Sequence, residues 1–92
     1  MPDTVSRQMQ IVNVKGLHAR ASAKFVEVVE AFDANAEVHH DGNSASGDSI
    51  MGLLMLAAAK GSTIDVQTSG PDAAALADAL ETLVADRFGE DM

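Results

Sequence analysis

Apolar and polar positions alternate along residues 5–14, where Val5, Met9 and Ile11 share one phase. Such alternation is typical of a strand that buries one of its faces. Between residues 19 and 32 the apolar positions instead recur every three or four residues, which is the spacing of one face of a helix. The buried face of this helix is expected to hold five residues: Ala21, Phe25, Val28, Val29 and Phe32.

Two short strands joined by a tight turn are predicted next. Ala36 and Val38 share one phase in a strand over residues 36–41. The Asp-Gly-Asn sequence that begins at residue 41 favours a hairpin turn. A third strand, over residues 43–46, should therefore pair back onto the second.

A short apolar stretch after Ser49 predicts the second helix, over residues 50–59. Serine is a favoured N-cap because its hydroxyl accepts a hydrogen bond from an unpaired backbone N–H. Lys60 and Gly61 would end this helix, since a cation suits the last turn and glycine suits the position after it.

The remaining residues predict a fourth strand, in which Ile64 and Val66 alternate with polar residues, and a final helix. The Gly-Pro-Asp sequence at residue 70 opens that helix, because proline suits the first helical turn. Its apolar stripe comprises six residues: Leu76, Ala77, Leu80, Leu83, Val84 and Phe88. The order β-α-β-β-α-β-α indicates an α+β fold, with a four-stranded antiparallel sheet covered by helices on one face.

Composition limits what this fold can do. A chain of 92 residues suits one domain, spanning residues 1–92, and with 47% hydrophobic but only 3% aromatic residues its core must be aliphatic. A net charge of −8 disfavours nucleic acid and anionic membranes as partners. The chain has no cysteine, its longest apolar run is too short to span a bilayer, and its first residues lack signal-peptide features. We therefore expect a cytoplasmic protein without membrane insertion.

His18 lies where the first helix should begin, and Arg20 follows it by two residues. A helix start presents unpaired N–H groups and partial positive charge, which suit an anion. An imidazole there could act as a nucleophile toward a phosphoryl group, while the guanidinium contacts its oxygens. From spacing alone, a histidine that simply caps the helix is the better explanation of these residues.

A second histidine cluster invites a metal-binding interpretation. His39 and His40 are adjacent in a predicted strand and should point to opposite faces of the sheet, so they cannot easily share one ion. We therefore predict no metal site, and nothing in the sequence calls for a cofactor.

Residues 16–25 read GLHARASAKF and residues 48–66 read DSIMGLLMLAAAKGSTIDV. Together, at this spacing, they closely resemble the histidine-containing phosphocarrier (HPr) family of the bacterial phosphotransferase system, from about residue 8 to residue 88. The resemblance implies an open-faced β-sandwich of four antiparallel strands and three helices. It further implies that Nδ1 of His18 receives a phosphoryl group from phosphorylated enzyme I and passes it to an enzyme IIA, assisted by Arg20.

The resemblance also assigns roles around the second helix. Ser49 matches a serine that an HPr kinase/phosphorylase modifies in many bacteria. A partner-docking surface is expected at six residues: Ala19, Lys24, Ile50, Met51, Leu54 and Met55. Several positions depart from the family pattern, among them Asp48, Glu27 and Glu30. The most notable is Ala21, which stands where proline is common and should leave the start of the first helix less rigid.

Two hypotheses follow. The chain is either a phosphocarrier without turnover of its own, or a regulatory interaction module in which Ser49 is the switch and His18 is structural. The pairing of His18 with Arg20 favours the carrier, because regulatory relatives lack the active histidine. A carrier that visits several partners should be a monomer with small, transient interfaces.

Overall fold

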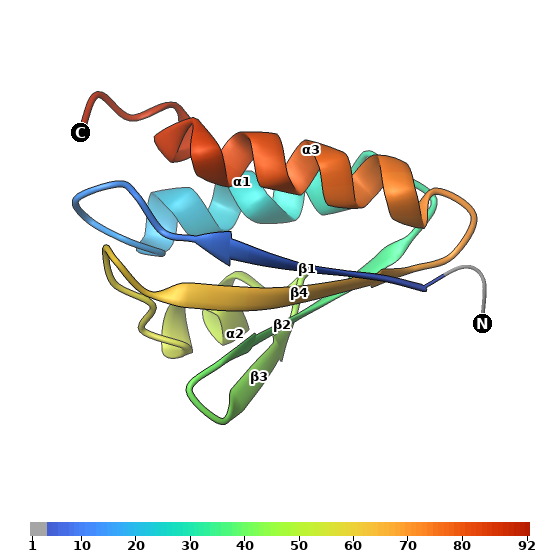
Figure 1. Ribbon diagram of the computed structural model, residues 1–92, viewed down its shortest axis with the longest axis horizontal. Coiled ribbons are helices and arrows are strands. Elements are labelled where there is room, and N and C mark those ends of the chain that lie inside the picture. Colours follow the sequence, from blue (N-terminus) through green and yellow to red (C-terminus); the bar gives the residue numbers. More distant parts are fainter. Residues whose placement is uncertain (1–3) are drawn as a thin grey trace.

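The computed structural model describes residues 4–92 and contains the predicted β-α-β-β-α-β-α order (Figure 1). Residues 1–3, which begin the segment expected to lack a signal peptide, lie outside the described residues. The elements are β1 (Thr4–Gln10), α1 (Ala19–Glu30), β2 (Asn35–His40), β3 (Asn43–Ser46), α2 (Ile50–Met55), β4 (Thr63–Ser69), α3 (Ala73–Ala85) and a final 3₁₀ turn, η1 (Arg87–Gly89).

The four strands form one antiparallel sheet in the order β1-β4-β2-β3. Val38 of β2 lies opposite Val66 of β4, and Met9 of β1 lies opposite Ile64. These pairs place apolar side chains on one face, because alternate residues of a strand point to the same side. The hairpin turn is as predicted, with Asp41 and Gly42 both at positive φ, which two-residue turns of this kind require.

All three helices pack on that apolar face, and α1 and α3 lie side by side along it (Figure 1). The predicted fold, an α+β open-faced β-sandwich, is confirmed. A single aliphatic core joins sheet and helices, and its largest fully buried apolar side chains are Phe25, Phe88, Ile11, Leu53, Ile64, Leu76, Leu80, Val38, Val66 and Val84. The opposite face of the sheet is polar and open, with Gln8 opposite Asp65 and Ser6 opposite Gln67.

The first strand is shorter than predicted. It ends at Gln10, although Ile11 still pairs by both backbone groups with the turn at residues 61–62. The chain then turns through Gly16, whose φ is +67° and whose Cβ position would lie 2.5 Å from the Ala58 carbonyl oxygen. Only glycine fits at this position, where the backbone turns and packs against Ala58. Residues 11–18 therefore form a packed loop rather than a continuation of the strand.

The first two helices, α1 and α2, also end earlier than predicted. α1 ends at Glu30, so Phe32 lies beyond it, partly buried against the core. α2 ends at Met55, and Ala57 has a φ of +54°. The Ala58 carbonyl instead accepts a hydrogen bond from the Leu17 N–H at 2.9 Å. This contact with the loop before α1 overrides helix propensity, so the prediction that Lys60 and Gly61 end the helix was wrong.

The last helix begins at Ala73, two residues after Pro71. Phe88 belongs to the predicted apolar stripe and is fully buried, but it does not lie on α3. Arg87 and Phe88 both have positive φ, and this bend turns the chain away from the helix axis. The C-terminal residues are thereby directed toward the start of α1 (Figure 1).

Candidate functional site

His18 is the N-cap of α1 and has extended backbone geometry. Its carbonyl accepts the hydrogen bond from the Ser22 N–H at 2.8 Å, and the Ser22 hydroxyl donates to the Leu17 carbonyl at 3.2 Å. The imidazole Nδ1 accepts from the backbone N–H of Arg20 at 3.3 Å. These contacts fix the start of α1 without the proline that the family commonly has at the position of Ala21.

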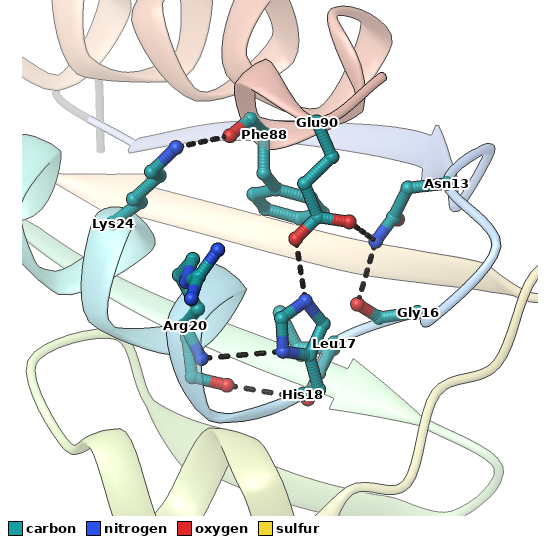
Figure 2. Close-up of polar contacts among 9 residues, drawn as sticks. Asn13, Gly16, Leu17, His18, Arg20, Lys24, Phe88 and Glu90 are labelled. Atoms are coloured by element: carbon teal, nitrogen blue, oxygen red, sulfur yellow. Dashed lines mark hydrogen bonds and ion pairs between the residues drawn. The ribbon is translucent and has the colours of Figure 1, made fainter. Parts of the chain in front are cut away.

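The other ring nitrogen of His18 meets the C-terminal end of the chain. Nε2 lies 2.5 Å from Oε2 of Glu90, and both side chains are largely shielded from solvent (Figure 2). Nδ1 accepts from a backbone N–H, so it carries the lone pair, and Nε2 must carry the proton that it donates to the carboxylate. The geometry therefore favours the tautomer whose Nδ1 lone pair lies at the helix N-terminus.

Glu90 is held in turn by Asn13. The Asn13 amide Nδ2 donates to Oε1 of Glu90 at 3.0 Å and to the Gly16 carbonyl at 2.8 Å. Burial of Glu90 opposes its ionisation, but hydrogen bonds from Asn13 and His18, with the charges of His18 and Lys15, outweigh it. The pKa of Glu90 therefore lies below its ordinary value.

The turn η1 carries Glu90 to this place. Phe88 anchors the turn in the core, and its carbonyl accepts a hydrogen bond from Nζ of Lys24 at 2.7 Å (Figure 2). Gly89 has a φ of +77°, which suits glycine. The structure thus gives Lys24, predicted to dock a partner, a contact within the chain.

Arg20 is exposed beside His18. It lines a cleft of about 330 Å³ together with Lys15, Lys24 and Glu90. Three cations and two carboxylates, those of Glu90 and Asp91, line this cleft, and every side-chain amine or guanidinium there can donate to an oxygen of an anion. The structure therefore brings together the two residues that the sequence singled out, His18 and Arg20.

Ser49 caps α2 as predicted. Its Oγ accepts from the Gly52 N–H at 3.0 Å, and the residue is half-buried. The preceding residue, Asp48, accepts a hydrogen bond from the Ser46 hydroxyl at 2.6 Å. The capping contacts of Ser49 are thus confined to neighbouring residues.

The apolar side chains of α2 divide between core and surface. Leu53 is fully buried in the core. Four exposed residues form what we call the α2 patch: Ile50 (41% exposed), Met51 (66%), Leu54 (37%) and Met55 (75%). Ala19, the first residue of α1, is also exposed. Because α2 packs against α1, the patch lies on a helix next to the one that carries His18.

No pattern in the sequence pointed to Asn13 or Glu90, and none indicated a role for Arg7. Arg7 pairs with Asp78 and Glu81 of α3 at 2.8 and 2.9 Å, so these acids are ion-pair partners as well as surface residues. Glu90 is 72 residues from His18 in the sequence, and no local pattern marks it. The only available signal was the apolar Phe88, which predicts that the chain stays near the core up to that point.

His39 and His40 have separate partners. His39 contacts Glu37 on its own strand, whereas His40 contacts the Leu56 carbonyl after α2. Within residues 4–92, no three His, Cys, Asp or Glu side chains are grouped so that they could hold a metal ion. Over the same residues, no helix has the length and apolar character needed to cross a membrane.

Comparisons with known proteins match this site and fold. A family model described as the PTS HPr component phosphorylation site matches residues 5–86. Phosphocarrier protein HPr of Cupriavidus necator is 44% identical over 86 residues, which cover 94% of this chain and 97% of that protein. Phosphocarrier protein NPr of Escherichia coli is 37% identical over 89 residues, with coverage of 96% and 99%.

Solved structures agree. The crystal structure of HPr-C-His from Thermoanaerobacter tengcongensis has a TM-score of 0.90 and 31% sequence identity, and the match covers 96% of this chain and 99% of that one. Proteins of this kind are carriers of a phosphoryl group rather than catalysts. On the combined evidence of family model, relatives and fold, the chain belongs to the histidine-containing phosphocarrier (HPr) family of the phosphotransferase system.

Proposed function

We propose that this chain accepts a phosphoryl group from phosphorylated enzyme I on Nδ1 of His18. It then passes the group to an enzyme IIA of a sugar-transporting or nitrogen-related phosphotransferase branch. The observation that carries the proposal is the orientation of the His18 ring, with Nε2 on Glu90 and Nδ1 at the N-terminus of α1. Membership of the HPr family supports it.

In each transfer, the bond formed and the bond broken can be followed at the His18 ring. The Nδ1 lone pair attacks phosphorus, the N–P bond forms, and the bond between phosphorus and its carrier atom on enzyme I breaks. Nε2 keeps its proton, so the ring becomes positively charged and the Glu90 carboxylate balances that charge. When enzyme IIA takes the phosphoryl group, the N–P bond breaks and its electron pair returns to Nδ1 as a neutral imidazole.

Arg20 assists both transfers. Its guanidinium lies at the cleft beside His18 and can donate two parallel hydrogen bonds to phosphoryl oxygens. The backbone N–H groups at the start of α1 add donors and partial positive charge at the same place. These groups favour the phosphoryl group in transit as well as when it is bound to Nδ1.

The α2 patch and Ala19 form the docking surface for enzyme I and enzyme IIA in this proposal. Four exposed apolar side chains on one short helix are unusual for a surface that has no partner. Lys24 can join this surface only if its contact with the Phe88 carbonyl is released or shared. The interfaces should be small, as expected for a monomeric cytoplasmic carrier that exchanges partners.

Ser49 is the proposed regulatory site, modified by an HPr kinase/phosphorylase. Its hydroxyl lies at the N-cap of α2, next to Ile50 and Met51 of the α2 patch. A phosphate there adds about −1.5 to −2 charges, which must be desolvated when a partner covers the patch. Phosphorylation of Ser49 should therefore slow phosphoryl transfer to His18.

Incubation with phosphoenolpyruvate and the cognate enzyme I tests the proposal. The wild-type chain should gain one acid-labile phosphate, and His18→Ala should gain none while remaining folded. His39→Ala is the matched control, because the imidazole of His39 has its only hydrogen bond in the described part of the chain with Glu37 and the variant should label like wild type. Labelling of His18→Ala would overturn the assignment, and absence of labelling in wild type would favour the regulatory module.

A further inference from the structure

Asn13 is a fully buried polar residue to which the transfer steps described above assign no part. Its amide nitrogen makes two hydrogen bonds, to the Gly16 carbonyl and to Oε1 of Glu90. Its Oδ1 is buried without a hydrogen-bond partner among residues 4–92. Buried polar atoms are nearly always paired, so this orphaned oxygen calls for an explanation.

The orientation of the amide supplies one. Both partners of Nδ2 are oxygen acceptors, one a carbonyl and the other a carboxylate. A flipped amide would place Oδ1 against these two acceptors and would lose both hydrogen bonds. The unpaired Oδ1 is therefore the consequence of using Asn13 as a double donor at this position.

The two oxygens of Glu90 have different partners as a result. Oε1 accepts from Asn13 at 3.0 Å, and Oε2 faces Nε2 of His18 at 2.5 Å (Figure 2). Rotation of the carboxylate would break both contacts at once. Asn13 thus links the loop before α1, through Gly16 and Glu90, to the ring that begins α1.

We propose that Asn13 is a positioning residue that acts on His18 through Glu90. By holding the carboxylate as an acceptor toward Nε2, it favours the tautomer that has its proton on Nε2 and its lone pair on Nδ1. The inference rests on the proposed function, because only a phosphoryl acceptor needs that lone pair. It adds a residue that touches neither the phosphoryl group nor the His18 ring.

The experiment measures the ring nitrogens of His18 by NMR, since their ¹⁵N chemical shifts distinguish a protonated from an unprotonated nitrogen. Asn13→Leu keeps the branched shape and the number of heavy atoms of the side chain, removes the donor together with the orphaned oxygen, and leaves the Gly16 carbonyl without this hydrogen bond. Glu90→Gln changes the next group in the chain of contacts. Asn35→Leu, at an exposed position of β2, is the matched control.

In wild type and in Asn35→Leu, we expect the proton on Nε2 and the lone pair on Nδ1. In Asn13→Leu, the ¹⁵N chemical shifts of the two ring nitrogens should become more alike, because both tautomers are then populated. Phosphoryl transfer from enzyme I should slow by about threefold to tenfold, as expected when a charge-assisted contact in the relay is lost. The double variant Asn13→Leu/Glu90→Gln should be no slower than Glu90→Gln alone, because both changes break one linkage.

The inference would be overturned if Asn13→Leu had the same His18 ¹⁵N chemical shifts and the same transfer rate as wild type. Additive losses of transfer rate in the double variant would also overturn it. Should Asn13→Leu not fold, the unmodified protein decides the point. Its Asn13 amide protons should shift as Glu90 titrates, together with the His18 ring nitrogens, and amide protons insensitive to that titration would contradict the linkage. A wild-type chain that is not phosphorylated on His18 would refute the proposed function, whereas the ring-nitrogen comparison would still test Asn13.

Discussion

His18 and Ser49 occupy equivalent places at the starts of two helices, yet the molecule supports them very differently. Each side chain accepts a hydrogen bond from a backbone N–H of the helix that it caps: His18 from Arg20, and Ser49 from Gly52. The other side of the His18 ring is held by Glu90, from the far end of the chain, whereas the capping contact of Ser49 is local. A group that must transfer phosphate reversibly needs a fixed ring, while a group that is only modified needs access.

The residues that surround His18 and Ser49 also differ in charge. The cleft that Glu90 lines next to His18 holds three cations, Arg20, Lys15 and Lys24, as well as the carboxylates of Glu90 and Asp91. Ser49 instead follows Asp48 and precedes the apolar α2 patch. A phosphate group is therefore stabilised at one cap and costly to desolvate at the other when a partner docks. In the proposed function, this contrast would let one site carry phosphate and the other act as a brake.

Removing the guanidinium should have the largest effect on this contrast. Arg20→Ala should slow phosphoryl transfer through His18 by about tenfold or more, because a charge-assisted contact contributes roughly 1.5–3 kcal/mol and each ~1.4 kcal/mol is a decade in rate. Arg20→Lys should recover only part of the rate, since the two-pronged contact is lost. Rapid-quench kinetics with enzyme I would check this, and a wild-type rate for Arg20→Ala would remove Arg20 from the mechanism.

A mimic of the phosphorylated serine should have the next largest effect. Ser49→Asp should lower the rate of His18 phosphorylation by about fivefold, which corresponds to roughly 1 kcal/mol of weakened binding. Thermal stability should hardly change, because an anion suits a helix N-terminus. Kinetics at several enzyme I concentrations would show whether the loss lies in binding.

Salt separates the two causes of that defect. Screening weakens repulsion between exposed charges but barely affects desolvation of the α2 patch. Persistence of the defect at high salt is expected, and its disappearance there would identify repulsion as the cause. Equal rates for Ser49→Asp and wild type at both salts would exclude the brake altogether.

Glu90 should make the His18 site sensitive to acid. Since its pKa is lowered in the folded protein, the unfolded chain binds more protons near that range, and stability rises with pH there. This contribution is present above the ordinary pKa of 4.5 and is lost as pH falls through the lower, folded value. Chemical denaturation from pH 3 to pH 7 should show a flatter acid limb for Glu90→Gln. An identical pH dependence for the two proteins would contradict the contact.

The smallest effect should come from the local cap. Ser49→Ala removes the acceptor for the Gly52 N–H and should cost about 1 kcal/mol of stability. Ser46→Ala is the matched control on the neighbouring strand, where the hydroxyl has Asp48 as its only hydrogen-bond partner among residues 4–92 and the cost should be within about 0.5 kcal/mol. Urea unfolding would compare them, and equal losses would mean that Ser49 contributes nothing as a cap.

The same division between local and distant contacts explains what could be predicted from the sequence. The Ser49 cap and the hairpin at Asp41 depend on neighbours in the chain, and these predictions are confirmed. The early end of α2 depends on a hydrogen bond from Leu17 to Ala58, which local propensity does not contain.

The candidate site could likewise be predicted only in part from the sequence. Its centre, His18 and Arg20, could be predicted from the chemistry of a helix start and from the resemblance to a family. Glu90 could not, because Phe88 was expected to continue α3, whereas left-handed residues at 87 and 88 turn the chain toward α1. Asn13 could not either, since it was expected to lie in a strand and its role depends on Glu90.

The most direct test of the account is to find which atom carries the phosphate. The chain, labelled with ¹⁵N in its histidines, is phosphorylated with enzyme I and phosphoenolpyruvate, and the coupling between ³¹P and ¹⁵N is measured. The account predicts that phosphorus is bonded to Nδ1 of His18 and that Nε2 keeps its proton. Phosphorus on Nε2 of His18, or on His39 or His40, would contradict it.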